Sequence, residues 1–275
     1  MFLMMSLVYK NPLLALKVSR NWIKSHHKAY EIIHKNDSVA YVSWNNYTGT
    51  YKLGGLGISL EFQERKESRP WWAKLFTKRD ADEAGRKSAE QIEAQWQPDE
   101  GKKNNRGKKP RSLDFIGIDY YCRWNLPGSF TDADNWEIYP EGFYKVIKNY
   151  YNWFKVPVLV AENGMATRNL EPRSDGWTRE AFMVQHVKQM QRAIKDGIPV
   201  IGYIHWSITD NYEWGTFDQR FGIYTVDCKN ENFERIPTPA VEVYRNIVEN
   251  NGVTPELERA YPDPRLKMGE ILKNK

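Results

Sequence analysis

Short apolar runs alternate with longer segments of helical spacing along this chain, and that alternation limits the folds it can adopt. The runs are rich in β-branched and aromatic residues, and the segments between them repeat their apolar residues with a helical period. The predicted strands are 39–44, 113–121, 156–161 and 200–207, and the predicted helices are 12–36, 139–154, 179–196 and 239–250. Repeated strand–helix units of this kind predict an α/β protein with a parallel sheet.

Two parts of the chain are read from weaker signals. Asn45, Asn46 and Gly49 predict a turn directly after the first strand. Residues 60–111 show only patches of amphipathic character, so we expect a long charged loop region with short helices in it. Six Lys or Arg residues and no acid lie in 102–111, but no aromatic residues are interleaved with them, so we expect a solvated loop rather than a nucleic-acid site.

Composition excludes several classes of protein. The chain is 41% hydrophobic and 14% aromatic, which gives it the apolar surface that disordered chains lack. The longest apolar run, 1–8, is too short to span a membrane and lacks the features of a signal peptide, so we expect a cytoplasmic protein without membrane contact. Cys122 and Cys228 cannot form a disulfide framework, and no Cys/His spacing predicts zinc. We expect two reduced, buried cysteines and no metal or cofactor.

The carboxyl ends of parallel strands are where ligands bind, so the residues there are the candidates for chemistry. Glu162 follows the apolar run 158–161, and a strand buried on both faces leaves its charged end residue only the mouth of the sheet. Glu162 is therefore the leading catalytic candidate. The alternative is an acid that caps the next turn or pairs with an arginine.

A second group of candidates follows the last predicted strand. Glu213 lies beside Trp214, and an acid beside an indole suits sugar binding because carboxylates accept hydrogen bonds from hydroxyls and aromatic faces pack on pyranose C–H groups. The alternative is a core tryptophan with a solvated glutamate. We assign no catalytic role to the dispersed histidines, which are His26, His27, His34, His186 and His205.

Four segments together resemble the C-terminal half of glycoside hydrolase family 1, the retaining enzymes of β-glucosidase type. They are D-F-I-G-I-D-Y-Y (114–121), W-E-I-Y-P-E (136–141), V-A-E-N-G (160–164) and the long segment 202–222 that contains H-W-S and D-N-Y-E-W. Their order and spacing agree with the family as well. The resemblance implies a TIM (β/α)8 barrel of which only the C-terminal four βα units, a half barrel, are present.

The resemblance implies a role for each matching residue. Glu162 matches the catalytic nucleophile, which attacks the anomeric carbon and forms a glycosyl-enzyme intermediate. Tyr121 matches the tyrosine that orients this carboxylate. Trp206 matches the aromatic floor of the sugar site, and Glu213 and Trp214 match the pair that binds the outer hydroxyls. Metals and cofactors play no part, and the implied substrate is a β-glycoside or oligosaccharide.

Departures from the family pattern affect the same site. Phe221 matches a residue that lines the sugar pocket, but Asp119, also placed in the substrate site, stands where the family usually has Asn. An added carboxylate there is expected to raise neighbouring carboxyl pKa values. The segment between Trp214 and Arg220 is about one residue shorter than in the family, so we expect a reshaped outer subsite.

The acid/base residue of the family lies in an N-E-P motif at the end of the fourth strand, and the 275 residues contain no Asn-Glu-Pro. The helix 12–36 resembles the one after that strand, so we expect 1–275 to be a single partial glycoside hydrolase domain with 60–111 as an insertion. A fragment, half of a split enzyme with a separately encoded N-terminal half or self-association, and a degenerate remnant all stay open. A non-catalytic carbohydrate-binding or partner-assembly module is the alternative function.

Overall fold

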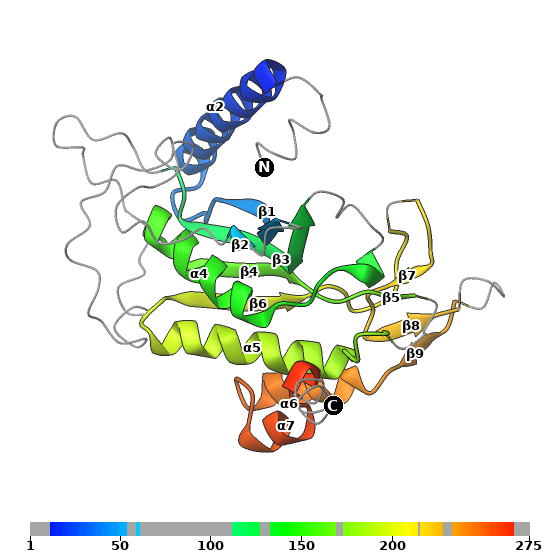
Figure 1. The fold of residues 1–275 in the computed structure, drawn as a ribbon. Helices are drawn as coiled ribbons and strands as arrows, with labels where there is room; N and C mark the ends of the chain where they lie inside the picture. Colours follow the sequence, from blue (N-terminus) through cyan, green and yellow to red (C-terminus); the bar gives the residue numbers. More distant parts are fainter. Residues whose placement is uncertain are drawn as a thin grey trace.

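A single five-stranded sheet organises the protein, which we describe from a computed structural model (Figure 1). The strand order is β2-β1-β3-β4-β6, and all neighbours are parallel except β1 and the short β2. The strands are β1 (Ser43–Leu53), β2 (Ser59–Leu60), β3 (Phe115–Leu126), β4 (Val158–Asn163) and β6 (Val200–His205). The residues that the structure describes are 12–53, 59–60, 112–126, 133–168, 173–213, 215–227 and 233–266.

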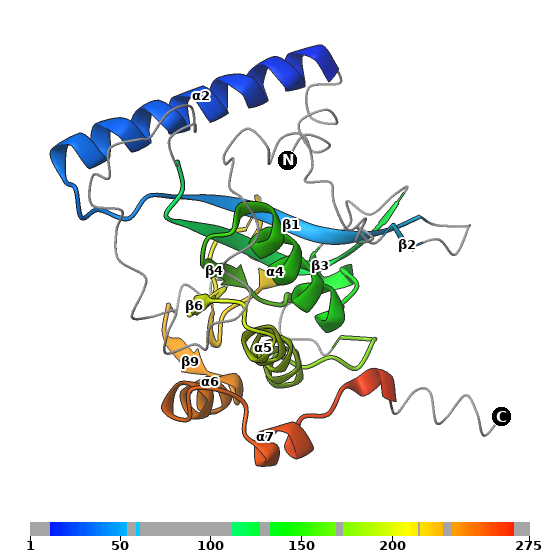
Figure 2. The same ribbon diagram turned by 90° about the vertical axis from the view of Figure 1, so that its left-hand side faces the viewer.

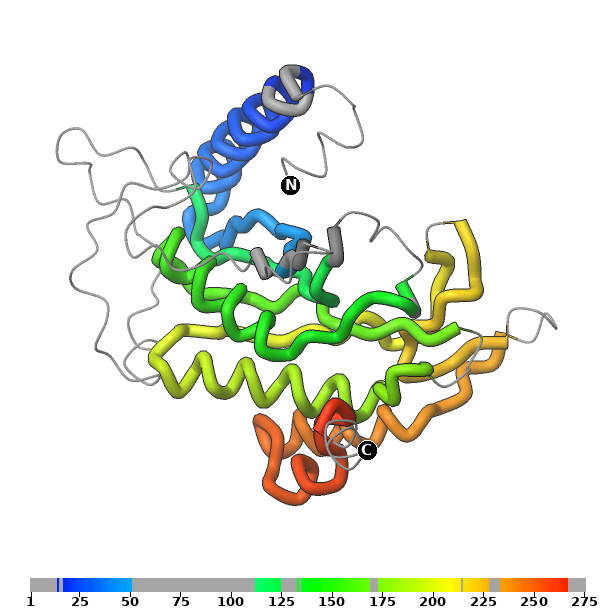
Figure 3. Tube along the Cα trace, viewed as in Figure 1, coloured from blue at the N-terminus to red at the C-terminus, as the bar shows by residue number. Residues whose placement is uncertain are grey.

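Helices follow the strands as the alternation predicts, and the chain trace in Figure 3 shows the sequential order. Helix α4 packs against the sheet and against α5, and α6 and α7 pack on α5, while α2 lies beyond β1 (Figures 1 and 2). The helices are α2 (Pro12–Asn36), α4 (Pro140–Phe154), α5 (Arg179–Lys195), α6 (Ala240–Glu249) and α7 (Pro255–Ala260). No helix in the described ranges is long and apolar enough to cross a membrane.

Local sequence explains where these helices begin. Pro140 lies in the first turn of α4, where its missing N–H leaves no hydrogen bond unmade. Thr178 precedes α5, and its hydroxyl accepts a hydrogen bond from the amide of Ala181 at 3.2 Å. Short pairs complete the described structure: η2 (Ala133–Asn135), β5 (Thr167–Arg168) with β7 (Gln219–Arg220), and β8 (Tyr224–Val226) with β9 (Arg235–Pro237).

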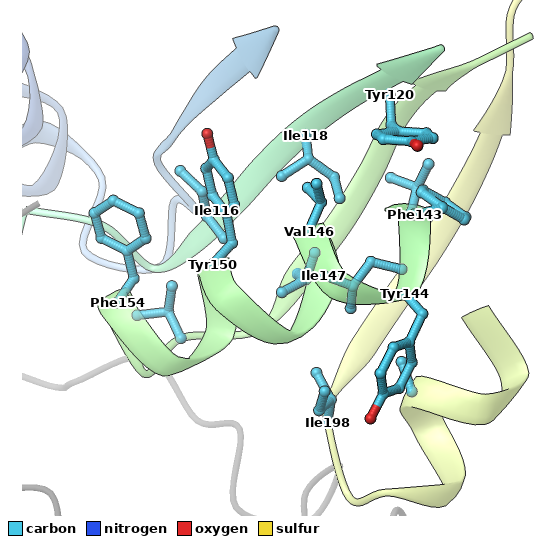
Figure 4. Packing of buried hydrophobic residues seen from close by; sticks show 14 of the residues in the cluster. Ile116, Ile118, Tyr120, Phe143, Tyr144, Val146, Ile147, Tyr150, Phe154 and Ile198 are labelled. Atoms are coloured by element: carbon cyan, nitrogen blue, oxygen red, sulfur yellow. The ribbon is translucent and has the colours of Figure 1, made fainter. Parts of the chain in front are cut away.

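The main core lies between the sheet and α4. Ile116, Ile118 and Tyr120 alternate along β3 and point toward the helix, where they meet Phe143 and Ile147 (Figure 4). Four of these side chains are fully buried, and Ile116 is 2% exposed. Burial of each such side chain contributes about 1.5–3 kcal/mol to stability. Because strand residues alternate between faces, the residues between them lie on the opposite face of the sheet.

The prediction for the first strand was wrong. The strand begins at Ser43, and the three expected turn residues lie within β1, which pairs with β3 as far as Leu53. Asn45 and Asn46 are used there for cross-strand and strand–helix hydrogen bonds, to Asp119 and to the hydroxyl of Tyr150. A Cβ at Gly49 would lie 2.7 Å from the indole nitrogen of Trp124, so this glycine provides close packing instead of a turn.

Most other predicted elements agree with the structure within two residues at each end, but β3 runs to Leu126, beyond the end predicted at 121. The sequence reading missed α7 and the short strands β2, β5, β7, β8 and β9. The expected helices and basic loop of 61–111 lie outside the described residues, as does Cys228. Cys122 is a buried free thiol, as expected.

Candidate active site

The parallel pairing of β3 and β4 places the two central carboxylates at matching positions of neighbouring strands, near the carboxyl end of β4. Asp119 and Glu162 are paired positions in the parallel register of β3 and β4, next to a register shift. Asn163, directly after Glu162, is paired in the same way with His205 at the end of β6. The ends of β4 and β6 therefore lie side by side, next to Asp119 within β3.

Tyr121 holds the carboxylate of Glu162. Its hydroxyl donates a hydrogen bond to Oε2 of Glu162 at 2.7 Å. Burial, and then the hydrogen bond and charge of Glu162, raise the pKa of Tyr121 well above its usual value, so the phenol stays a donor. In the described part of the chain, no lysine or arginine forms an ion pair with Glu162. Among the described residues, the geometry therefore gives no support to the alternative in which Glu162 pairs with an arginine.

Aromatic rings fix the position of the Tyr121 ring. Tyr47 from β1 stacks on it with ring centroids 5.8 Å apart, and Phe221 and Trp136 each contact it edge-on, also at 5.8 Å. Phe221 is 4% exposed, so it packs in this cluster. The tyrosine that reaches Glu162 is therefore held by residues from three other parts of the chain.

Trp206 and Glu213 form a second hydrogen-bonded pair after β6. The indole Nε1 of Trp206 donates to Oε1 of Glu213 at 2.9 Å, and the side-chain amide of Asn211 donates to the same oxygen at 2.8 Å. Glu213 is 8% exposed and Trp206 is half-buried. Trp214, the neighbour predicted to share this role, lies outside the described residues.

The ends of β4 and β6 approach closely behind these side chains. The amide of Trp206 donates to the carbonyl of Asn163 at 3.0 Å, and the peptide bond between Trp206 and Ser207 is cis. A Cβ at Gly164 would overlap the carbonyl oxygen of Trp206. A residue larger than glycine at 164 would therefore force the two strand ends apart.

A buried aspartate anchors the loop that carries Glu213. Asp210 accepts hydrogen bonds from the amide of Gly222 at 2.9 Å and the hydroxyl of Thr225 at 2.7 Å, and it pairs with Arg220 at 3.3 Å. The sequence reading noted this acid after the strand but gave it no role. Its place in D-N-Y-E-W, three residues before Glu213, is the signal that could have found it.

Asp119 lies on the same face as Glu162 and is held by Asn45. The amide nitrogen of Asn45 lies 2.9 Å from each carboxylate oxygen of Asp119. Burial raises the pKa of Asp119 to about 6; the Asn45 hydrogen bond opposes this effect, and the charge of Glu162 adds to it. Asn45 is a site residue that sequence reasoning missed, because its Asn-Asn-x-x-Gly context predicts a turn.

Two of the histidines, His186 and His205, are buried and uncharged. His205 is buried beside the ring of Tyr244 in α6, and burial, followed by the charge of Arg179, lowers its pKa to about 3. Burial lowers the pKa of His186 to about 3 as well. Both are therefore neutral at ordinary pH. No group of three or more potential metal ligands occurs among the described residues.

Comparison with solved structures defines the class of fold. The β-glycosidase of the hyperthermophile Thermosphaera aggregans superposes with a TM-score of 0.61 at 29% identity, over 89% of this chain and 50% of that chain. The Thermotoga maritima β-glucosidase in complex with deoxynojirimycin has the same fold, with a TM-score of 0.62 at 24% identity over 87% of this chain and 57% of that one. The parallel sheet and its helices are thus part of the TIM barrel found in these glycosidases.

Sequence comparison then gives the family. Residues 86–253 match the model of glycosyl hydrolase family 1, and the chain belongs to this family. The β-galactosidase of Sulfolobus acidocaldarius is 34% identical over 180 residues, which cover 56% of this chain and 35% of that protein. The chain therefore spans between about a third and somewhat more than half of the proteins that it matches here.

Proposed function

We propose that this chain carries the nucleophile half of a retaining β-glycosidase, with Glu162 as the nucleophile and a β-glucoside or β-galactoside as substrate. The observation that carries the proposal is the 2.7 Å hydrogen bond from Tyr121 to Glu162 at the carboxyl end of the parallel sheet. Membership of family 1 and the names of the relatives support the same class of reaction.

In this mechanism Glu162 attacks the anomeric carbon of the sugar as the bond from that carbon to the leaving oxygen breaks. A glycosyl ester forms on Glu162, and water then displaces it, so the configuration at the anomeric carbon is retained. Tyr121 fixes the direction of the attacking carboxylate. A second carboxylic acid protonates the leaving oxygen and then takes a proton from water.

The remaining residues bind the sugar ring. Trp206 offers the face of its indole to the C–H groups of the ring, and Glu213 accepts hydrogen bonds from outer hydroxyls. Trp206 and Asn211 both hold Oε1 of Glu213, which supports a fixed orientation of this acceptor. We assign Trp214, Phe221 and Asp119 to the same subsite.

We propose that the second carboxylic acid comes from a part of the barrel that these 275 residues do not contain, because they hold no N-E-P motif. The open edge of the sheet supports this proposal. In the described part of the chain, β6 pairs only with β4. Ile201, Ile204 and Ile208, on β6 and just after it, are 42%, 53% and 51% exposed. Residues 1–275 would then form one part of a single barrel domain.

Covalent labelling tests the nucleophile without needing the second acid. Dinitrophenolate leaves without protonation, so 2,4-dinitrophenyl 2-deoxy-2-fluoro-β-D-glucoside should transfer its sugar to Glu162 in the full chain, and peptide mass spectrometry locates the adduct. Glu162→Gln should remove the adduct, while Glu242→Gln on the surface of α6 should leave it. An adduct on another residue, or one that persists in Glu162→Gln, would exclude this mechanism.

Binding and hydrolysis measurements distinguish the glycosidase from the alternative function. Binding of a neutral thioglucoside without any adduct would favour the non-catalytic carbohydrate-binding module. Hydrolysis of ordinary aryl β-glucosides should appear only after addition of a polypeptide with the first four strand–helix units and the N-E-P motif of a family member. Equal hydrolysis by the pure chain would contradict the proposed origin of the second acid.

A further inference from the structure

Two carboxyl groups lie on neighbouring strands near the carboxyl end of β4, and the mechanism above uses only one of them. Asp119 and Glu162 are paired positions of adjacent parallel strands. The family resemblance places an uncharged Asn at position 119. This chain therefore has one more ionisable group beside the nucleophile than the family pattern requires.

The surroundings of Asp119 contain no compensating cation in the described ranges. From β1, Asn45 donates to both carboxylate oxygens at 2.9 Å, and Tyr47 is the register partner of Asp119. From β4, the facing group is Glu162, and on β3 itself the charge of Asp119 acts on Tyr121. Asp119 is 7% exposed, so little water screens its charge.

We propose that ionised Asp119 gives this site a second negative charge that selects cationic sugar-like ligands, both protonated iminosugars and the oxocarbenium-like transition state. The proposal rests on the proposed function for the location of the sugar. The transition state of glycoside hydrolysis carries positive charge on the ring, and fixed opposite charges in a buried site stabilise such states strongly. Neutral sugars gain nothing from the added charge.

The same geometry gives the effect a pH dependence. Burial raises the pKa of Asp119 to about 6, with the Asn45 hydrogen bond opposing the shift and the charge of Glu162 adding to it. The second charge is therefore present above about pH 6 and is lost below it.

Calorimetric binding to Asp119→Asn and to the unaltered full chain tests the proposal. The probes are deoxynojirimycin, whose ring amine is protonated, and the neutral methyl β-D-thioglucoside. At pH 7.5 we expect Asp119→Asn to bind deoxynojirimycin roughly tenfold more weakly, while at pH 5 the ratio of the two affinities approaches one. The thioglucoside should bind both proteins equally at both pH values. The free amine titrates identically in both experiments, so the ratio of the two affinities compares the two proteins at each pH.

Controls distinguish the possible failures. Glu242→Gln removes an exposed carboxylate of α6 and should change neither affinity. An equal loss for both ligands, or a loss independent of pH, would overturn the proposal and leave Asp119 a packing role. If the unaltered chain binds neither ligand, both the sugar site and this inference are wrong. If Glu162 forms the adduct but the ratio of deoxynojirimycin affinities does not change with pH, only the inference is wrong. As a second measurement, carbon-13 spectra of the unaltered chain should show one aspartate titrating near pH 6, and the absence of such a signal would count against it.

Discussion

The buried carboxyl of Asp119 makes the stability of the chain depend on pH, and one substitution can remove that contribution. Its pKa is 3.8 in the unfolded chain and about 6 in the folded protein. The stabilisation that comes from its bound proton is fully present below pH 3.8 and is lost as the pH rises through about 6. Asp119→Asn keeps the shape of the side chain and removes this titration.

The size of the pKa shift of Asp119 determines how much the unfolding free energy changes with pH. A difference of about two pKa units corresponds to about 3 kcal/mol of unfolding free energy, of which about 2.5 kcal/mol develops between pH 4 and pH 7.5. Asparagine has one carboxamide oxygen to accept the Asn45 amide, so loss of the second contact subtracts about 0.5–1.5 kcal/mol at every pH. The variant should therefore be about 1.5–2.5 kcal/mol more stable than the unaltered chain at pH 7.5, and equal or slightly less stable at pH 4.

Urea unfolding at pH 4 and pH 7.5 measures the difference in stability between Asp119→Asn and the unaltered chain at each pH. Glu242→Gln is the control, because it removes one exposed carboxylate. The side chain of Glu242 is 72% exposed, so the control should change stability by less than about 0.5 kcal/mol at either pH. The reasoning is refuted if Asp119→Asn changes stability by the same amount at pH 4 and pH 7.5, or if it is relatively less stable at the higher pH.

Three further substitutions follow from the site. Tyr121→Phe should slow fluoroglucoside labelling of Glu162 by roughly tenfold to a hundredfold, because it removes a hydrogen bond to a charged group; a time course by mass spectrometry checks this, and an unchanged rate contradicts the orienting role. Gly164→Ala should lower the unfolding free energy by about 2–4 kcal/mol, because the methyl group meets the carbonyl of Trp206, and wild-type stability in urea would show that the strand ends can separate freely. Asp210→Ala should lower the unfolding free energy by about 3–5 kcal/mol, because the buried Arg220 loses its carboxylate partner. A loss below about 1 kcal/mol in the same urea assay would mean that water reaches the pair.

Strand β4 and helix α4 could be predicted because they depend on local pattern. The apolar run 158–161 ends at Glu162, and one-dimensional spacing is enough to place that side chain at the mouth of a parallel sheet. Likewise, the helix at 139–154 is amphipathic and follows a clear proline start. Both elements were therefore found with ends shifted by at most two residues.

Pairings between distant segments could not be predicted in the same way. Asn45 and Asp119 are 74 residues apart, and the local sequence around Asn45 is typical of a turn. Only the register of β1 with β3 turns that amide toward the carboxylate. Similarly, the partners of Asp210 lie 10 to 16 residues further along the chain, across two short strands that carry little periodic signal.

The open edge at β6 also bears on how the protein behaves in solution. Its segment, Val-Ile-Gly-Tyr-Ile-His, contains no lysine, proline or acid, which are the residues that usually protect a sheet edge from pairing with other chains. The histidine of the segment is uncharged at neutral pH, so it adds no repulsion. A chain produced without a covering strand is therefore prone to aggregation, and a gain in soluble yield on co-expression is a direct readout of a polypeptide that caps this edge.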